Sequence, residues 1–140
     1  MKRIIVPTVF ILGVIGILVL FLPREGFDIE IENQANKDIF GLYLTYENIK
    51  KDIEIPTIRA GEKEEFQVSV KDNSSDNFEE AALKLIYEDN EGNQQTEYII
   101  GYFEKGYYGE AKINILSVDE KGKLEIEVTE NTKFFNKSKG

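Results

Sequence analysis

Cysteine, histidine and tryptophan are all absent from the 140 residues of the chain. Without cysteine there is no disulfide framework, no thiolate metal site and no cysteine nucleophile. Without histidine the chain lacks the side chain that most often serves as a general base or metal ligand at neutral pH. No glycine-rich phosphate-binding motif is present either. We therefore expect a protein that is not an enzyme and that holds no cofactor and no metal.

Basic residues are few compared with acidic ones. The whole chain has 17 Lys and Arg against 26 Asp and Glu, and residues 27–140 have 14 against 25, a net charge of −11. A surface of this sign repels phosphate backbones and anionic lipid headgroups. We expect no nucleic acid among the partners, and no motif indicates a small-molecule substrate.

One segment of the acidic chain carries no charge at all. Residues 4–22 follow Met1-Lys2-Arg3, and fifteen of these nineteen residues are Ile, Leu, Val or Phe. At about 1.5 Å per residue, a helix of this length spans roughly 28 Å, close to the thickness of a hydrocarbon core. The sequence therefore predicts a single-pass transmembrane helix that serves as a signal-anchor.

A cleaved signal peptide is the alternative to a retained anchor. The apolar run is followed by Pro23-Arg24-Glu25-Gly26-Phe27, which lacks the small-residue pattern of a cleavage site, so retention is favoured. Lys2 and Arg3 precede the run and acidic residues follow it. By the positive-inside rule, the N-terminus is expected in the cytoplasm and the C-terminal domain outside the cell membrane, in an extracytoplasmic location.

From Phe27 onward, apolar residues alternate with polar ones at the period of two that is typical of β-strands. Turn-forming residues separate these runs at regular intervals. The apolar positions of the expected strands are Phe27, Ile29 and Ile31; Phe40, Leu42, Leu44 and Tyr46; Ile53, Ile55 and Ile58; Phe66, Val68 and Val70; Leu83, Leu85 and Tyr87; Tyr98, Ile100 and Tyr102; Tyr107, Ala111, Ile113 and Ile115; and Leu124, Ile126 and Val128.

Seven or eight short strands in about a hundred residues indicate a mostly β fold, an antiparallel β-sandwich of immunoglobulin-like type. A small open barrel is the alternative. Residues 78–82 are compatible with a helical turn before the fifth strand. The expected layout is a cytoplasmic N-terminus at 1–3, the transmembrane helix at 4–22, a short linker at 23–26, the extracytoplasmic domain at 27–130 and a flexible polar tail at 131–140.

Aromatic residues gather around one predicted hairpin. Tyr102, Phe103, Tyr107 and Tyr108 surround the pair Lys105-Gly106, where we expect the turn. Exposed aromatic side chains offer large contact area at a low cost in conformational entropy, which suits a partner-binding surface. Packing of the same rings across neighbouring strands is the structural alternative.

Two oxygen-rich stretches, 72–77 and 88–93, lack the ligand spacing of an EF-hand and are interpreted as ordinary turns.

The overall hypothesis is a membrane-anchored binding module of an accessory, sensory or immunity type, with a protein partner at the outer membrane face. The alternative is a structural subunit of an envelope, secretion or transfer assembly, in which the helix itself makes the contacts.

Overall fold

A computed structural model describes residues 25–134. The predicted anchor at 4–22 and the part of the predicted tail after Phe134 lie outside the described residues. Among residues 25–134 no helix has the length and apolar character needed to cross a bilayer. The helix found in this range is α2, which covers the four residues Val70–Asn73.

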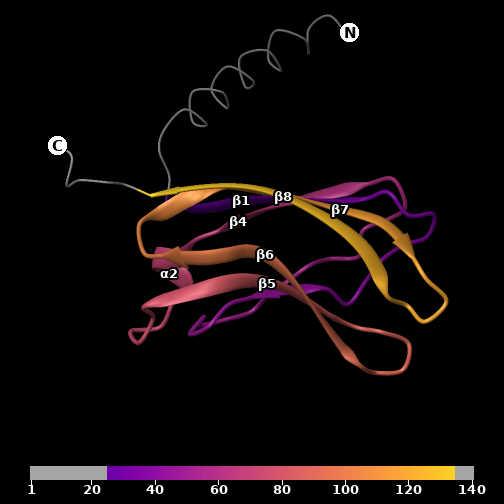
Figure 1. The fold of residues 1–140 in the computed structure, drawn as a ribbon, viewed down its shortest axis with the longest axis horizontal. Coiled ribbons are helices and arrows are strands. Elements are labelled where there is room, and N and C mark those ends of the chain that lie inside the picture. Colours follow the sequence, from indigo (N-terminus) through magenta and orange to yellow (C-terminus); the bar gives the residue numbers. More distant parts are fainter. Residues whose placement is uncertain (1–24, 135–140) are drawn as a thin grey trace, which may run out of the picture.

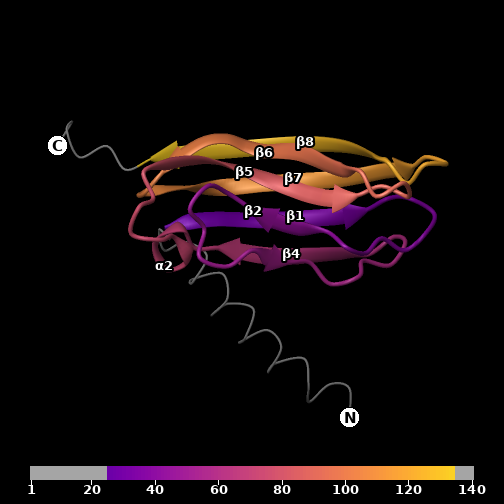
Figure 2. The same ribbon diagram turned by 90° about the horizontal axis from the view of Figure 1, so that it is seen from below.

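Eight strands form two four-stranded sheets that face each other as layers (Figure 1). Sheet I has the strand order β4-β1-β7-β8, and sheet II has the order β3-β2-β5-β6. The strands of both sheets run along the long axis of the domain (Figure 2). The strand bounds are β1 Gly26–Asn33, β2 Tyr43–Thr45, β3 Ile53–Glu54, β4 Lys63–Val68, β5 Glu80–Glu88, β6 Gln94–Glu104, β7 Tyr107–Val118 and β8 Leu124–Phe134.

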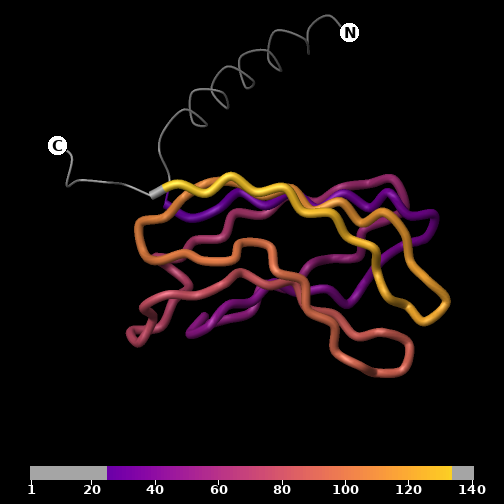
Figure 3. The backbone as a smooth tube through the Cα atoms, in the orientation of Figure 1, coloured from indigo at the N-terminus to yellow at the C-terminus, as the bar shows by residue number. Residues whose placement is uncertain are grey.

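The predicted β-rich fold is confirmed, and the pairing is antiparallel except between β1 and β7. These two strands run parallel, with Phe27 beside Gly109 and Ile31 beside Ile113. A parallel neighbour is possible because the chain crosses to sheet II and back twice between β1 and β7, a path that the tube in Figure 3 follows. β8 extends to Phe134, because its last residues pair with the first residues of β7, so the domain continues four residues past the predicted boundary at 130.

Alternating apolar residues of both sheets fill the space between them. Phe27, Ile29 and Ile31 of β1 are buried, as predicted from their spacing. Leu83 and Leu85 of β5 face them from sheet II within the same apolar core. Burial of this kind contributes roughly 1.5–3 kcal/mol for each large side chain, so the period of two is the feature of the sequence that stabilises the fold most.

The strand β6 departs from the predicted alternation. It is 11 residues long and pairs with the nine residues of β5, so two of its residues are extra and its register shifts twice. Each extra residue in one strand moves the following side chains to the other face. As a result Ile100 is buried as predicted, while Tyr98 is 62% exposed and Tyr102 is 48% exposed.

The helical turn expected at 78–82 is not formed; the chain has a helical turn at α2 instead. Ser69 begins this helix, and its hydroxyl accepts a hydrogen bond from the amide of Asp72 at 3.1 Å. Val70 enters the core from the first turn. At 80–82 the chain is already in β5, because Ala81 is needed in the core opposite Phe103.

Candidate functional site

The predicted aromatic hairpin is a connection between the two sheets. β6 lies in sheet II and β7 lies in sheet I, so the turn at Lys105-Gly106 crosses from one layer to the other. The turn lies at the end of the domain where β1 begins, together with α2 and the end of β8 (Figure 1). We call this the entry end, defined by Gly26, Lys105, Gly106, α2 and Phe134.

Phe103 belongs to the core and does not present a contact surface. Its side chain is fully buried, and its ring makes edge contacts with Phe27 and Tyr46, each at 5.2 Å between centroids. It also stacks on Phe78 at 5.7 Å. The sequence prediction that placed Phe103 on an exposed hairpin was wrong, because the second shift in β6 turns this residue inward.

The three tyrosines around the turn remain at the surface. Tyr102 is about half exposed, and Tyr107 and Tyr108 are partly buried. The rings of Tyr102 and Tyr107 meet edge to face at 6.0 Å, so the two strands share one small aromatic surface. The hydroxyl of Tyr102 donates to the carboxylate of Glu104, which holds the pKa of Tyr102 well above its usual value. Tyr102 therefore stays neutral across the physiological range.

At the opposite end two hairpin turns have the same construction. In each turn an aspartate accepts two backbone amides: Asp89 those of Glu91 and Asn93, and Asp119 those of Lys121 and Lys123. These hydrogen bonds lower the pKa of both carboxyls, the bond from Asn93 contributing most at Asp89 and that from Lys123 most at Asp119. We call this the turn end of the domain.

The two turns are bonded to each other across the sheets. The amide of Asn90 donates to the carbonyl of Lys121 at 2.8 Å, and its side chain donates to the carbonyl of Glu120 at 3.2 Å. Nearby, the amide of Leu124 donates to the Tyr87 hydroxyl at 2.9 Å. Burial is the main reason that the pKa of Tyr87 is raised, so this hydroxyl remains protonated. Hydrogen bonds thus join the two turns into one frame at the turn end.

A groove of about 510 Å³ lies against this frame. Ile39 and Phe40 of the loop before β2 form one wall together with Tyr43, the first residue of β2, while Val118 and Leu124 of sheet I form another. Phe40 is 76% exposed, the largest exposed fraction among the big apolar side chains of residues 25–134. An exposed phenylalanine beside an apolar groove is the surface on this domain best suited to contact a partner.

The alternation of apolar residues did not indicate this groove, because it predicted Phe40 on the inward face of a strand with Leu42 and Leu44. Gly41 has a φ of 78°, so the backbone turns between Phe40 and Leu42 and the alternation starts only after it. Leu42 and Leu44 are buried as predicted, and Phe40 is directed away from them. A glycine inside an apparent strand was the available signal.

A second hollow of about 660 Å³ crosses the outer face of sheet I. Its lining includes Asp28, Glu65 and Glu110, with Lys112 as its basic residue. Lys112 forms ion pairs with Glu30 at 3.5 Å and with Glu32 at 3.6 Å. Exposed pairs of this kind contribute about 0–1 kcal/mol, so they shape the surface charge more than the stability.

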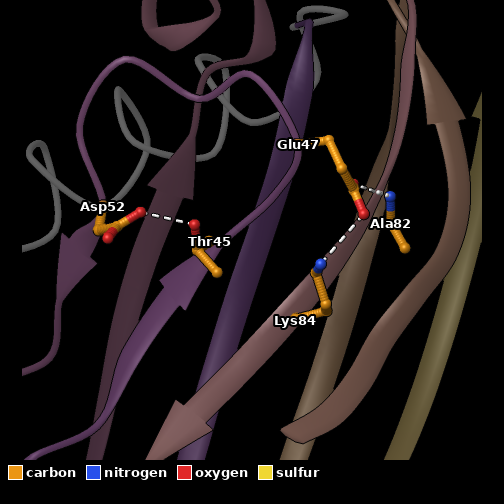
Figure 4. Close-up of polar contacts among 5 residues, drawn as sticks. All are labelled: Thr45, Glu47, Asp52, Ala82 and Lys84. Carbon is orange, nitrogen blue, oxygen red and sulfur yellow. Dashed lines mark hydrogen bonds and ion pairs between the residues drawn. The ribbon is translucent and has the colours of Figure 1, made fainter.

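Polar contacts on the outer face of sheet II serve a structural purpose (Figure 4). Glu47 accepts the amide of Ala82 at 3.1 Å and the ammonium of Lys84 at 3.0 Å, and Thr45 donates to Asp52 at 2.5 Å. Burial opposes ionisation of Glu47, but the bonds from Ala82 and Lys84 outweigh it and lower its pKa. These contacts hold the loop after β2 against β5.

Residues 25–134 contain no group of three or more acidic side chains placed to hold a metal ion. The polar side chains described above bind backbone amides or neighbouring side chains of the domain itself. The arrangement offers two surfaces for contact, the tyrosines at the entry end and the Phe40 groove at the turn end.

Neither a family model nor a curated protein matches the chain. Among solved structures, the chain is similar to the NMR structure of the protein from Eubacterium rectale, with a TM-score of 0.45 and 15% sequence identity. The similarity covers 75% of this chain and 89% of the other. A likeness at this level carries no conclusion about function.

Proposed function

We propose that the protein is a membrane-anchored, non-enzymatic binding module whose domain lies outside the cytoplasm. Residues 4–22 would form the single-pass helix, with Lys2 and Arg3 on the cytoplasmic side. The domain follows after a linker of a few residues. The entry end is then next to the membrane, and the turn end is directed away from it, toward a protein partner at the outer membrane face.

The observation that carries the proposal is the exposure of Phe40 beside the groove at the turn end. Phe40 is 76% exposed in the free protein. Burying its side chain against a partner would therefore contribute roughly 1.5–3 kcal/mol to the free energy of binding. The frame of the two bonded turns keeps the groove in one shape, which lowers the entropy lost on binding. The groove is lined by residues of positive and negative charge, Lys37 and Asp38 among them. This lining suits a partner whose contact surface has an apolar centre surrounded by polar groups.

The proposal includes an immunoglobulin-like assignment of the fold. The order β3-β2-β5-β6 corresponds to C′-C-F-G of a variable-type domain, and the pair β4-β1 corresponds to E-B. β7 occupies the place of strand A beside B, but it is parallel to its neighbour. β8 lies beyond β7, and among residues 25–134 no strand occupies the place of strand D beside β4.

Site-specific photo-crosslinking in intact cells tests the binding surface. A photoreactive phenylalanine analogue at Phe40 is expected to give an adduct of one defined mass, because the groove is expected to hold one partner. The same analogue at Tyr98, which is 62% exposed on the outer face of sheet II, is the matched control. Equal adduct patterns at both positions, or none at Phe40, would contradict the assignment of the groove.

A structural subunit of an envelope, secretion or transfer assembly is the second candidate function. In that case the apolar segment 4–22 would itself make the contacts, although Gly13 and Gly16 are three residues apart and lack the four-residue spacing of the usual helix-packing motif. Replacing residues 4–22 by an unrelated transmembrane helix separates the two functions. A binding module keeps its Phe40 adduct after the exchange, whereas an assembly subunit loses it.

A further inference from the structure

We infer that the tyrosine surface at the entry end, formed by Tyr102, Tyr107 and Tyr108, rests in the headgroup region of the bilayer. The inference depends on the anchor of the proposed function and adds an orientation to it. The occupant of this surface is the lipid, not a soluble partner. The same domain then binds the membrane at one end and its protein partner at the other.

The register of β1 places the tyrosines beside the point where the chain enters the domain. Gly26, the first residue of β1, pairs with Tyr108 of β7, and Tyr108 in turn pairs with Lys133 of β8. Tyr107 precedes Tyr108 in β7, so its side chain lies on the opposite face of the strand, where it packs against the core and its ring contacts that of Tyr102 in sheet II. The tyrosine surface and the start of the domain therefore lie at the same end of the molecule. Figure 1 shows the turn between β6 and β7 at the end where β1 begins.

The length of chain between anchor and domain leaves little room. Four peptide units separate Leu22, the last residue of the predicted helix, from Gly26. Fully extended, they reach at most about 14 Å. The headgroup layer on each side of a bilayer is about 5–7 Å thick. The entry end must consequently lie within or just above this layer.

The domain is also held firmly at this point. Glu25 accepts the hydroxyl of Ser69 at 3.1 Å and the amide of Lys71 at 2.5 Å, so the described chain is fixed to the start of α2 one residue before β1. Gly26 has no space for a side chain, because a Cβ there would lie 2.1 Å from the carbonyl oxygen of Val68. The start of β1 is therefore fixed relative to α2 and to the end of β4.

Tyrosine is suited to this layer because its ring is apolar and its hydroxyl stays hydrated. The side chain of Tyr102 is neutral, with its hydroxyl directed to Glu104. Glu80 and Glu104 lie beside Tyr102, and Glu110, Lys105 and Lys133 lie nearby, so the charge around the tyrosines is slightly negative. The surface should thus dock on zwitterionic lipid without help from anionic headgroups, which the domain as a whole repels.

Tryptophan fluorescence in lipid vesicles tests this inference. The chain has no tryptophan of its own, so the emission comes only from the one that is introduced. The full chain is reconstituted in phosphatidylcholine vesicles, with or without bromine atoms on the acyl chains near the headgroups. The reporters are Tyr102→Trp and Tyr108→Trp. The matched controls are Phe40→Trp at the turn end and Tyr98→Trp midway along β6, on the outer face of sheet II. Resistance of the chain to extraction by alkaline carbonate is measured separately and reports the anchor.

Brominated lipid is expected to reduce the emission of the two reporters, because their indole rings would lie at the bilayer interface, and to leave the emission of both controls unchanged. If the chain resists extraction but the reporters behave as the controls do, the docking is wrong while the anchor stands. If the chain is extracted, the anchor fails and the docking with it. Quenching of Phe40→Trp together with the reporters would also overturn the orientation.

Discussion

The side-chain amide of Asn33 at the end of β1 donates to the carbonyl oxygen of Ile58, 25 residues later, at 2.9 Å. The same amide donates to the carbonyl of Lys37, and its oxygen accepts the amide of Ala35. Asn33 is fully buried, so one side chain replaces the water that these backbone groups would otherwise bind. The loop that carries Phe40 is thereby fixed to the end of the first strand.

Asn33→Asp is expected to lower the free energy of unfolding by at least about 3 kcal/mol. Aspartate has the same shape and still accepts the amide of Ala35. It cannot donate to the two carbonyls and brings a charge to a buried site. Urea unfolding followed by circular dichroism measures the effect. Asn36→Asp, at an exposed position of the same loop, is the control and should change stability by less than about 0.5 kcal/mol. Equal effects would mean that the hydrogen bonds of Asn33 do not stabilise the loop.

Phe103→Ala is expected to cost about 3–5 kcal/mol of unfolding free energy, because it opens a cavity among Phe27, Tyr46 and Phe78. Tyr102→Ala, one residue earlier, should cost less than about 1 kcal/mol, since it removes one edge contact at the surface. The same unfolding experiment compares them. A larger loss for Tyr102→Ala would show that the second shift in β6 is misplaced.

Gly109→Ala is expected to destabilise the domain by more than about 2 kcal/mol. Its φ is 153°, and a Cβ there would lie 2.0 Å from the carbonyl oxygen of Asn131 in β8. Gly101→Ala is the matched control, because nothing lies within 4 Å of a Cβ at that position. Thermal unfolding of the two variants should differ clearly. If both melt at the wild-type temperature, the close approach of β7 and β8 is not real.

The two capped turns predict how stability depends on pH. The pKa values of Asp89 and Asp119 are lower in the folded domain than in the unfolded chain. In an unfolded chain the pKa of an aspartate is about 3.9. Their contribution is therefore fully present above about pH 4 and is lost as the pH falls through the lower, folded-state values.

Asp89→Asn with Asp119→Asn should consequently be less stable than the wild type at pH 7, and the difference should narrow below about pH 4. Urea titrations of both proteins at several pH values measure this. A difference that stays constant across the range would mean that the charge of the two carboxylates contributes nothing.

The sequence predicted β1 well and β6 poorly, for physical reasons that these strands make clear. Phe27, Ile29 and Ile31 alternate strictly, and a one-residue slip would expose all three, so a single register is possible. In β6 the alternation breaks at Ile99 and Ile100, which are both buried. The break in alternation arises because nine residues of β5 pair with 11 of β6. The sequence of β6 alone does not show which strand it pairs with or how many residues that strand has.

Of the two candidate surfaces, the sequence indicated the tyrosines but not the Phe40 groove. The tyrosines were found from composition, because aromatic and glycine residues gather near residue 105, but the connection between sheets and the burial of Phe103 required the topology. The Phe40 groove is formed by segments up to 87 residues apart, from Lys37 to Leu124, and only the folded chain brings them together. Gly41 was the one local sign of it.

Cysteine labelling on intact cells tests the anchored, outward-facing domain most directly, because the chain has no cysteine of its own. Glu91→Cys places a thiol on the exposed turn between β5 and β6, and Lys2→Cys places one before the predicted helix. A membrane-impermeant maleimide should label Glu91→Cys on intact cells, and Lys2→Cys only after lysis. Labelling of Lys2→Cys on intact cells, or protection of Glu91→Cys until lysis, would contradict the proposed location of the domain.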